Sequence, residues 1–196
     1  MSTIVGADGI VRCWWCGDDP LYVDYHDEEW GRPLRDERAL FELLCLEGFQ
    51  AGLSWITILR KRAAFREAFE GFHPVVVARY DDLDVERLLL NPAIVRHRGK
   101  IMATIANAQA TEAMHEAGTS LEQIVWSHAP VARGAPLRHR DEVPPQTVTS
   151  AELARALRTW GMRFVGPTTA YAFMQSAGLV DDHLAGCHRA HEVAVS

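Results

Sequence analysis

Helical spacing of apolar residues is the feature that most limits what this chain can fold into. Apolar side chains recur three and four positions apart in most segments, and no window sustains the polar–apolar alternation of a half-buried strand. This pattern predicts an all-α fold with short connections and oblique or orthogonal helix packing, and it argues against a sheet.

Local start and stop signals place the expected helices. Asp36 is expected to cap a helix that carries Leu40, Leu44 and Glu47. Thr149 and Glu152 fit the capping box of a later helix over residues 151–160. Residues 128–148, rich in Pro, Arg and His, are expected to form an exposed loop. The remaining helices are expected to begin at Ser54, at Pro74, at Asp82 or Asp84, at about His97, at Ser120 and at Pro167, and Gly118, Gly161 and Gly178 are expected helix ends.

Composition narrows the class of protein. Hydrophobic residues make up 48% of the 196-residue chain, which indicates a globular protein of one sizeable domain or two small ones. No run of about 18 apolar residues and no signal-peptide pattern is present, so we expect no membrane span and a cytoplasmic location. The net charge of −6 argues against indiscriminate polyanion binding. The basic stretch RHRGK at residues 96–100 could still contact a phosphodiester backbone, or it could simply be a solvated patch.

Cysteine and histidine gather near the two ends of the chain. Cys13, Cys16 and His26 lie near the start, and His183 and Cys187, four residues apart, would share one face of a helical turn near the end. Cysteine and histidine are ligands that zinc favours, and a closed set of four marks a structural site. The spacing does not choose which four of the five bind. Scattered buried cysteines or a redox CxxC are the alternatives, although no βαβ pattern surrounds the CxxC.

His26 and Glu28 also match the H-x-E element of the zinc nucleobase deaminases. In those enzymes a P-C-x-x-C element follows downstream. Here the CxxC lies upstream and no strands are evident, so a deaminase remains a distant competitor.

Glu47 occupies an unusual position, at the end of an apolar helix face and beside Gly48 and Gly52. Aromatic faces with one buried carboxylate are what a flipped purine needs, because the rings stack on the base and the carboxylate accepts from its edge. Ordinary core packing of the aromatics and a solvated glutamate at a helix end are the competing interpretations. The aromatic residues concerned are Trp14, Trp15, Tyr22, Tyr25, Trp30, Phe49 and Trp55.

The glycine-bounded turn before Pro167 could hold a phosphate on the free N–H groups at the start of the next helix. Gly161 and Gly166 delimit this turn. An ordinary packing corner between two helices would have the same pattern.

Four segments together resemble the DNA-3-methyladenine glycosylase I family, collinearly from Arg12 to Cys187. They read RCWWCGDDPLYVDYHDEEWG, LFELLCLEGFQAGLSWITILRKR, RHRGKI and RFVGPTTAYAFMQSAGLVDDH. The resemblance implies an all-α helix-hairpin-helix DNA glycosylase that removes 3-methyladenine from double-stranded DNA. It also implies one structural zinc ion that ties the two ends of the chain together, and no organic cofactor. The zinc ligands would be Cys13, His26, His183 and Cys187, with Cys16 as an extra cysteine.

The resemblance also implies where the base and the DNA bind. Glu47 would be the catalytic and base-selecting residue, with Tyr25, Trp30 and Trp55 around the base. Leu53, in the loop before Trp55, would be the wedge into the emptied stack. The basic stretch and the turn before Pro167 add Lys100 and Gly166 as candidate DNA contacts. We expect a monomer with one domain over residues 12–188 and flexible ends at 1–11 and 189–196.

Scarcity of lysine bears on the chemistry. Apart from the N-terminus, only Lys61 and Lys100 could supply the amine that a strand-cleaving lyase needs, and neither lies in the Glu47 segment. A glycosylase without lyase activity is therefore expected. The family often carries lysines just before the hairpin, where this chain has Arg158 to Gly161. Asp181 and Asp182 lie near the position of an aspartate that many related enzymes use, but the resemblance assigns them no role.

Overall fold

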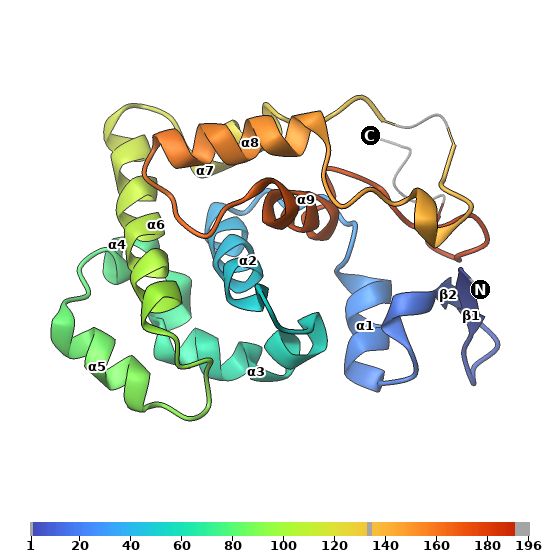
Figure 1. Ribbon diagram of the computed structural model, residues 1–196, viewed down its shortest axis with the longest axis horizontal. Helices are drawn as coiled ribbons and strands as arrows, with labels where there is room; N and C mark the ends of the chain where they lie inside the picture. Colours follow the sequence, from blue (N-terminus) through green and yellow to red (C-terminus); the bar gives the residue numbers. More distant parts are fainter. Residues whose placement is uncertain (1, 133–134, 191–196) are drawn as a thin grey trace.

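Helices make up most of the structure, a computed structural model that describes residues 2–132 and 135–190 (Figure 1). The all-α prediction is therefore confirmed, and no helix of the described part is long and apolar enough to cross a membrane. Short 3-10 turns lie at Trp14–Cys16, Glu70–Phe72 and Arg140–Glu142. The helices are α1 (Pro20–Glu28), α2 (Glu37–Gln50), α3 (Trp55–Ala68), α4 (Pro74–Val77), α5 (Asp82–Leu90), α6 (Arg98–Glu116), α7 (Leu121–Trp126), α8 (Val148–Thr159) and α9 (Pro167–Ser176).

Helix α2 is the centre of the core. It packs against α3, α6, α7 and α9, and Figure 1 shows it enclosed by these helices. Leu40, Phe41 and Leu44 are at most 1% exposed, and the helix stays buried on nearly every face through its last two turns. A helix that is buried all round belongs in the centre of a domain, so the residues near its C-terminus are shielded from water.

A small antiparallel hairpin at the N-terminus was not expected from the sequence. Strand β1 (Thr3–Val5) pairs with β2 (Val11–Cys13), with Thr3 opposite Cys13. Three-residue strands are too short to show period-two alternation, so the expectation of no sheet was wrong here. Strand β1 lies within the end at residues 1–11 that was expected to be flexible. The buried Arg12 holds the hairpin on α1, because its guanidinium bonds Asp8 within the hairpin and Asp27 on α1. At the other end, Arg189 and Ala190 are buried, and the rest of the expected flexible end lies outside the described residues.

Most helix starts agree with the sequence signals, and two differ. The Asp36 side chain accepts from the Ala39 N–H at 2.8 Å, as expected for the cap of α2. Helix α8 begins three residues earlier than predicted, because Thr147, and not Thr149, forms a reciprocal capping box with Ser150. Asp81 caps α5 in the same way, where Asp82 or Asp84 was expected. Helix α1 was missed, although Asp19 followed by Pro20 is a typical start signal.

Helices α8 and α9 pack on each other through the turn over residues 160–166, and the chain after α9 returns to the N-terminal segment. Gly178 ends α9 with a φ of 72°, and a Cβ there would lie 2.4 Å from the backbone carbon of Arg32. Only glycine fits this contact. It brings the segment after α9 against the loop after α1, where the residues of the site meet.

Candidate active site and metal centre

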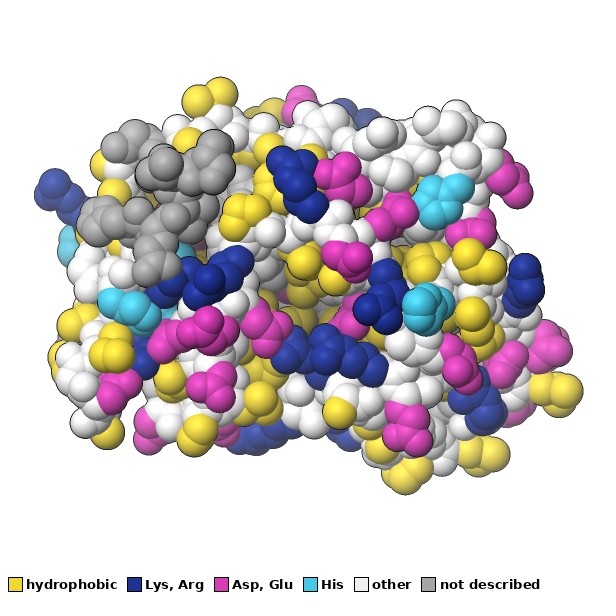
Figure 2. Space-filling view, turned by 180° about the vertical axis from the view of Figure 1, so that it is seen from behind, with side chains coloured by type: hydrophobic (Ala, Val, Ile, Leu, Met, Phe, Trp, Pro, Cys, Tyr) yellow, Lys and Arg dark blue, Asp and Glu magenta, His cyan; other side chains and the backbone are white. Residues whose placement is uncertain are grey.

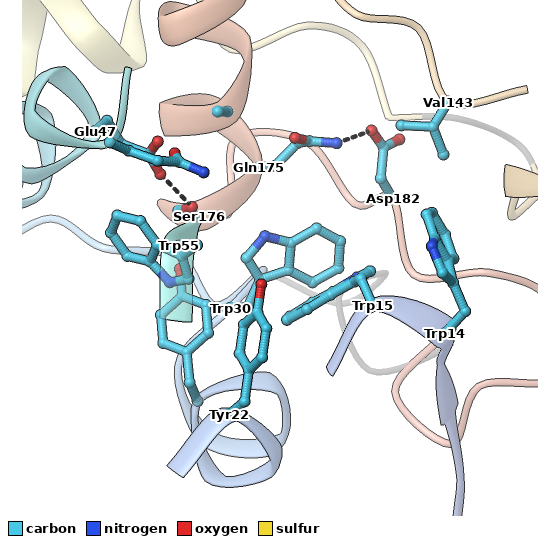
Figure 3. A pocket seen from close by; sticks show the side chains of 13 residues that line it. Trp14, Trp15, Tyr22, Trp30, Glu47, Trp55, Val143, Gln175, Ser176 and Asp182 are labelled. Carbon is cyan, nitrogen blue, oxygen red and sulfur yellow. Dashed lines mark hydrogen bonds between the residues drawn. The ribbon is translucent and has the colours of Figure 1, made fainter. Parts of the chain in front are cut away.

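A cavity of about 280 Å³ lies between α1, the C-terminal end of α2, the start of α3 and α9 (Figure 3). Rings from three segments close together in space form most of its wall. Tyr22 and Tyr25, three residues apart, share one face of α1, and Trp55 is the first residue of α3. Ring centroids lie 5.5 Å apart for Tyr25 and Trp55. The aromatic side chains that line the cavity are Trp14, Trp15, Tyr22, Tyr25, Trp30 and Trp55.

Glu47 projects into this cavity from the last turn of α2 and is 3% exposed. Ser176 on α9 donates its hydroxyl to Oε1 of Glu47 at 2.9 Å, while Oε2 has no hydrogen-bond partner among the described residues. Burial raises the pKa of Glu47 to about 8, and the bond from Ser176 opposes that rise. The carboxyl group is thus buried in the cavity and is not the solvated glutamate of the competing interpretation.

Two donors in the same cavity wall are also unused within the described residues. Tyr25 Oη and Trp55 Nε1 are buried and lack a hydrogen-bond partner. Burial also holds the pKa of Tyr25 well above its ordinary value, so its hydroxyl keeps its proton. Leaving such groups unpaired costs about 1–3 kcal/mol each, and native proteins rarely tolerate it without a reason. Two donors and one acceptor facing a ring-walled cavity fit a flat ligand with polar edges.

The polar end of the cavity was not expected from the sequence. Asp182, 2% exposed, accepts from Tyr171 Oη at 2.6 Å and from Gln175 Nε2 at 2.7 Å. In Figure 3 the Glu47–Ser176 pair lies at the left and the Gln175–Asp182 bond at the right, both above the rings of Trp30 and Trp15. The i, i+4 spacing of Tyr171 and Gln175 shows that they share a face of α9, but it does not indicate that this face meets Glu47.

A second hollow of about 240 Å³ shares Tyr25, Trp55 and Ser176 with the first. Its charged side chains are paired with one another, as Arg62 with Glu29 shows. Acidic and basic side chains are likewise interspersed over the face in Figure 2. Because the charged groups of the second hollow are already paired, the buried and unpaired polar atoms of the first cavity are the stronger indication of a ligand site.

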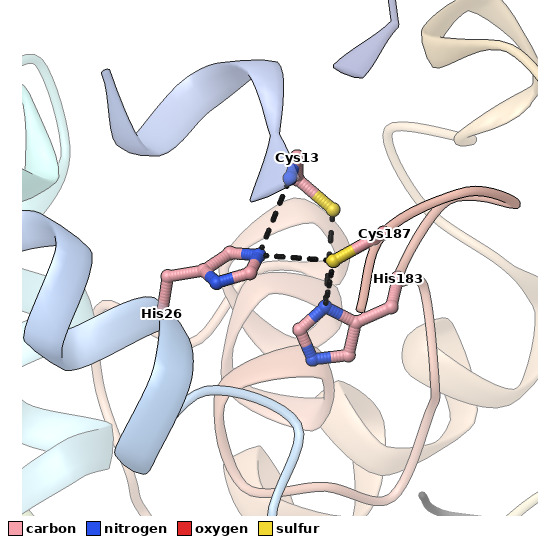
Figure 4. Close-up of side chains that lie close together, drawn as sticks. All are labelled: Cys13, His26, His183 and Cys187. Carbon is pink, nitrogen blue, oxygen red and sulfur yellow. Dashed lines mark hydrogen bonds between the residues drawn. The ribbon is translucent and has the colours of Figure 1, made fainter. Parts of the chain in front are cut away.

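The four expected metal ligands come together beside the cavity (Figure 4). The ligand atoms of Cys13, His26, His183 and Cys187 all lie within 4.8 Å of one another, and all four residues are buried. The sulfur–nitrogen distances are 3.5 Å for Cys187 to His26, 3.7 Å for Cys187 to His183 and 3.8 Å for Cys13 to His183. Bond lengths at a tetrahedral zinc would place sulfur and nitrogen about 3.6 Å apart, so this group could hold such an ion.

In both histidines, the ring nitrogen that points away from the metal site lies near a hydrogen-bond acceptor. His26 Nδ1 lies 2.7 Å from Asp27, which Arg12 holds, and His183 Nε2 lies 3.3 Å from the carbonyl oxygen of Trp30. When each outer nitrogen donates its proton, the inner nitrogen of each ring is left as a lone pair for a metal. The Trp30 ring also lines the cavity, so the metal centre and the cavity wall share this residue.

Two details of the metal site differ from the sequence analysis. His183 and Cys187 lie in a non-helical turn and not on a helix, and Gly186 in that turn has a φ of 93°. Cys16 is outside the cluster, because its thiol donates to the carbonyl oxygen of Cys13 at 3.2 Å. The structure thereby separates the four ligands from the fifth candidate, which spacing did not do.

Of the candidate DNA contacts, Leu53 is exposed, Gly166 is partly buried and Lys100 is buried. Leu53 is 43% exposed in the loop after α2, and Gly166 precedes α9. Lys100 is 7% exposed and donates to the carbonyl oxygens of Phe49 and Ala51 at 2.8 and 2.6 Å. This disagrees with the expected phosphate contact, because its ammonium already binds the C-terminal end of α2, where helix carbonyls lack partners.

Comparison with known proteins agrees with this geometry. A sequence model of the methyladenine glycosylase family matches residues 15–190. The DNA-3-methyladenine glycosylase of Haemophilus influenzae is 48% identical over 181 residues, which cover 90% of this chain and 96% of that protein. A crystal structure of 3-methyladenine DNA glycosylase I matches with a TM-score of 0.86 and 50% identity, over 90% of this chain and 98% of its own. A structure of the Staphylococcus aureus 3-methyladenine DNA glycosylase I, concerned with 3-methyladenine recognition, matches with a TM-score of 0.85 and 38% identity, over 91% and 96%. This chain belongs to the methyladenine glycosylase family.

Proposed function

We propose that this protein hydrolyses the N-glycosidic bond of 3-methyladenine in alkylated DNA after the damaged nucleotide has been flipped out of the duplex. The observation that carries the proposal is the buried Glu47 carboxyl group, whose Oε2 faces a ring-walled cavity without a partner among the described residues. A flipped base needs such stacking faces and an acceptor at its edge.

The charge of the lesion accounts for the selection. Methylation at N3 makes the adenine ring cationic, so the base attracts the Glu47 carboxylate and the π faces of rings such as Trp30 and Trp55. An unmodified adenine lacks that charge and would leave the buried carboxylate without compensation. The cationic base is also a good leaving group already, so the enzyme has little need to protonate it before water attacks the sugar.

The positions of the two lysines support hydrolysis without strand cleavage. A lyase step needs a free amine that can form a Schiff base with the sugar. Lys61 Nζ bonds the carbonyl oxygens of Pro92 and Ala93, and Lys100 Nζ bonds the end of α2. Neither lysine lines the cavity.

The metal centre is assigned as a structural zinc site. Two cysteines and two histidines are a donor set that zinc prefers, and four protein ligands leave no open position for a substrate or water. The bound ion would join β2 and α1 to the segment after α9, because Cys13 and His183 are 170 residues apart and His26 and Cys187 are 161 residues apart. This arrangement favours a role in holding the cavity wall together and disfavours a metal hydrolase or deaminase.

The remaining assignments concern the partner and the organisation of the chain. We propose that the exposed Leu53 enters the gap that the flipped nucleotide leaves, and that the N–H groups after Gly166 bind a phosphate of double-stranded DNA. We also propose that residues 12–188 act as one domain in a cytoplasmic monomer.

The test is release of free 3-methyladenine from methylated duplex DNA. Glu47→Gln and Trp55→Ala should each reduce the release rate at least about tenfold, since each removes a group that stabilises the cationic base. Glu67→Gln, at an exposed position on α3, is the matched control and should leave the rate unchanged. Duplex binding without any base release by the unmodified protein would instead indicate a DNA-binding module on the same scaffold.

A further inference from the structure

Phe164, in the turn between α8 and α9, combines two unfavourable features. Its side chain is 41% exposed, and its φ is 56°, in the left-handed region. For a residue other than glycine, that backbone conformation costs about 1–2 kcal/mol. Because the ring is exposed, burial of the phenyl group does not offset this cost. The strained and exposed position therefore indicates a role other than core packing.

The surrounding structure enforces this conformation. The side-chain amide of the buried Asn107, on α6, makes two hydrogen bonds to the residue before Phe164. Its Oδ1 accepts from the Arg163 N–H at 2.7 Å, and its Nδ2 donates to the Arg163 carbonyl oxygen at 3.3 Å. Strained residues persist where their neighbours over-determine them, and such residues cluster at functional sites.

Two glycines lie against the Phe164 side chain. A Cβ at Gly48 would lie 3.4 Å from Phe164 Cβ, and a Cβ at Gly99 would lie 3.8 Å from Phe164 Cε2. The His97 ring lies edge-on to the phenyl ring, with a centroid distance of 6.2 Å. These contacts hold the ring against α2 and the start of α6, while 41% of the side chain stays exposed.

The position of Phe164 relates it to the base cavity. Gly48 directly follows Glu47, so the turn that carries Phe164 lies against the helix end that carries the selecting carboxylate. The loop that begins after α2 exposes Leu53, a second apolar side chain, 43% accessible. Arg163, next to Phe164 in the turn, is exposed as well and supplies positive charge for a phosphate backbone.

We propose that Phe164 stacks on a base of the duplex that is uncovered when the target nucleotide is flipped, and that it acts with Leu53 as a second apolar contact. This inference rests on the proposed function, because it needs a duplex seated over the cavity. Apolar side chains that enter a base stack stabilise an opened duplex, and stacking on an aromatic ring tolerates any sequence. Phe164 thereby serves duplex engagement and not base recognition.

The experiment measures the affinity for a duplex that contains a tetrahydrofuran abasic analogue, which mimics the opened site and needs no cleavage. Phe164→Ala should weaken binding roughly tenfold, the effect expected for one lost stacking contact. Phe164→Trp should retain most of the affinity. Leu90→Ala removes another exposed apolar side chain, at the end of α5, and should leave the affinity unchanged.

Two further measurements separate stacking from other roles. The dependence of affinity on salt concentration should not change in Phe164→Ala, because no phosphate contact is lost. Phe164→Gly should lose affinity as Phe164→Ala does but unfold at a higher temperature than Phe164→Ala, since glycine relieves the positive φ. If affinity instead followed stability across these variants, Phe164 would be a structural residue and the inference would be wrong.

The outcomes also separate this inference from the proposed function. If the protein releases 3-methyladenine and Phe164→Ala binds the abasic duplex as tightly as the unmodified protein, the inference fails and the function stands. If Phe164→Ala weakens duplex binding but the unmodified protein releases no base, the inference stands and the function fails. Binding of free 3-methyladenine, followed by quenching of tryptophan fluorescence, should be the same in Phe164→Ala and the unmodified protein.

Discussion

Replacing Glu47 with glutamine should change how the stability of the fold depends on pH. The pKa of Glu47 is about 8 in the fold, against an ordinary value of 4.5, because burial disfavours the carboxylate. One pKa unit corresponds to about 1.4 kcal/mol, so ionising Glu47 destabilises the fold by up to about 5 kcal/mol at high pH. A carboxyl group with a raised pKa contributes stability that is complete below its unfolded pKa and is lost as pH rises through its folded pKa.

The magnitude can be worked out pH by pH. Relative to a side chain that does not titrate, Glu47 costs about 2 kcal/mol at pH 6, about 3 kcal/mol at pH 7 and about 4 kcal/mol at pH 8, and the cost levels off above that. The glutamine side chain of the variant retains an oxygen that can accept from Ser176 and carries no charge. The stability difference between Glu47→Gln and the unmodified protein should therefore grow by about 1 kcal/mol per pH unit between about pH 6 and pH 8.

Urea unfolding of both proteins at a series of pH values measures this difference directly. Other titrating groups affect both proteins alike, so the difference isolates position 47. Glu67→Gln serves as the control, and its stability difference should stay constant across the same range. If the curves for Glu47→Gln and the unmodified protein ran parallel from pH 6 to pH 9, Glu47 would not titrate in a buried site, and the argument for a charge-selecting cavity would lose its basis.

Three further changes test other parts of the structure. Lys100→Met should destabilise the fold by about 1–3 kcal/mol in urea unfolding, since two carbonyl oxygens at the end of α2 lose their donor. The salt dependence of DNA binding should stay the same, and a smaller salt dependence would show that Lys100 contacts a phosphate after all. If the proposed zinc site is filled, a chelator or Cys187→Ser should lower the unfolding temperature, whereas Cys16→Ser should keep full metal content by elemental analysis. Metal loss in Cys16→Ser would make Cys16 a ligand. Release of 3-methyladenine should rise with pH as Glu47 ionises. Ser176→Ala should raise the pKa of Glu47 further, because the lost hydrogen bond favours the carboxylate, and should move this rise to more alkaline values. An unchanged profile would separate the Glu47 charge from catalysis.

Much of the fold could be predicted because its signals are local. Asp36 caps α2 and Pro167 opens α9 as expected, since capping bonds and proline geometry involve residues three or four apart. The misplaced start of α8 is also a local matter, because Thr147 and Thr149 both precede a suitable partner, and the helix start follows the one whose box closes. The hairpin was not predicted because its strands are too short to show polar–apolar alternation.

Part of the candidate site was accessible from the sequence as well. The resemblance identified Tyr25, Trp30, Glu47 and Trp55, and all four line the same cavity. The basic stretch at residues 96–100 suggested Lys100 as a DNA contact, but the type and position of a residue do not tell whether its ammonium meets a phosphate or a carbonyl oxygen. Its burial, which lowers the pKa of Lys100, becomes visible only when α6 lies against the end of α2.

The sequence by itself determined the helical class, the family and the residue types from which a cavity and a metal site could be built. Only the tertiary structure decided that Ser176 binds Glu47 across 129 residues of chain, that Cys16 stands outside the metal cluster, and that Asn107 holds the turn of Phe164. The physical reason is that helix starts and ends depend on neighbours along the chain, whereas the pairing and burial of polar groups depend on which faces meet when the helices pack.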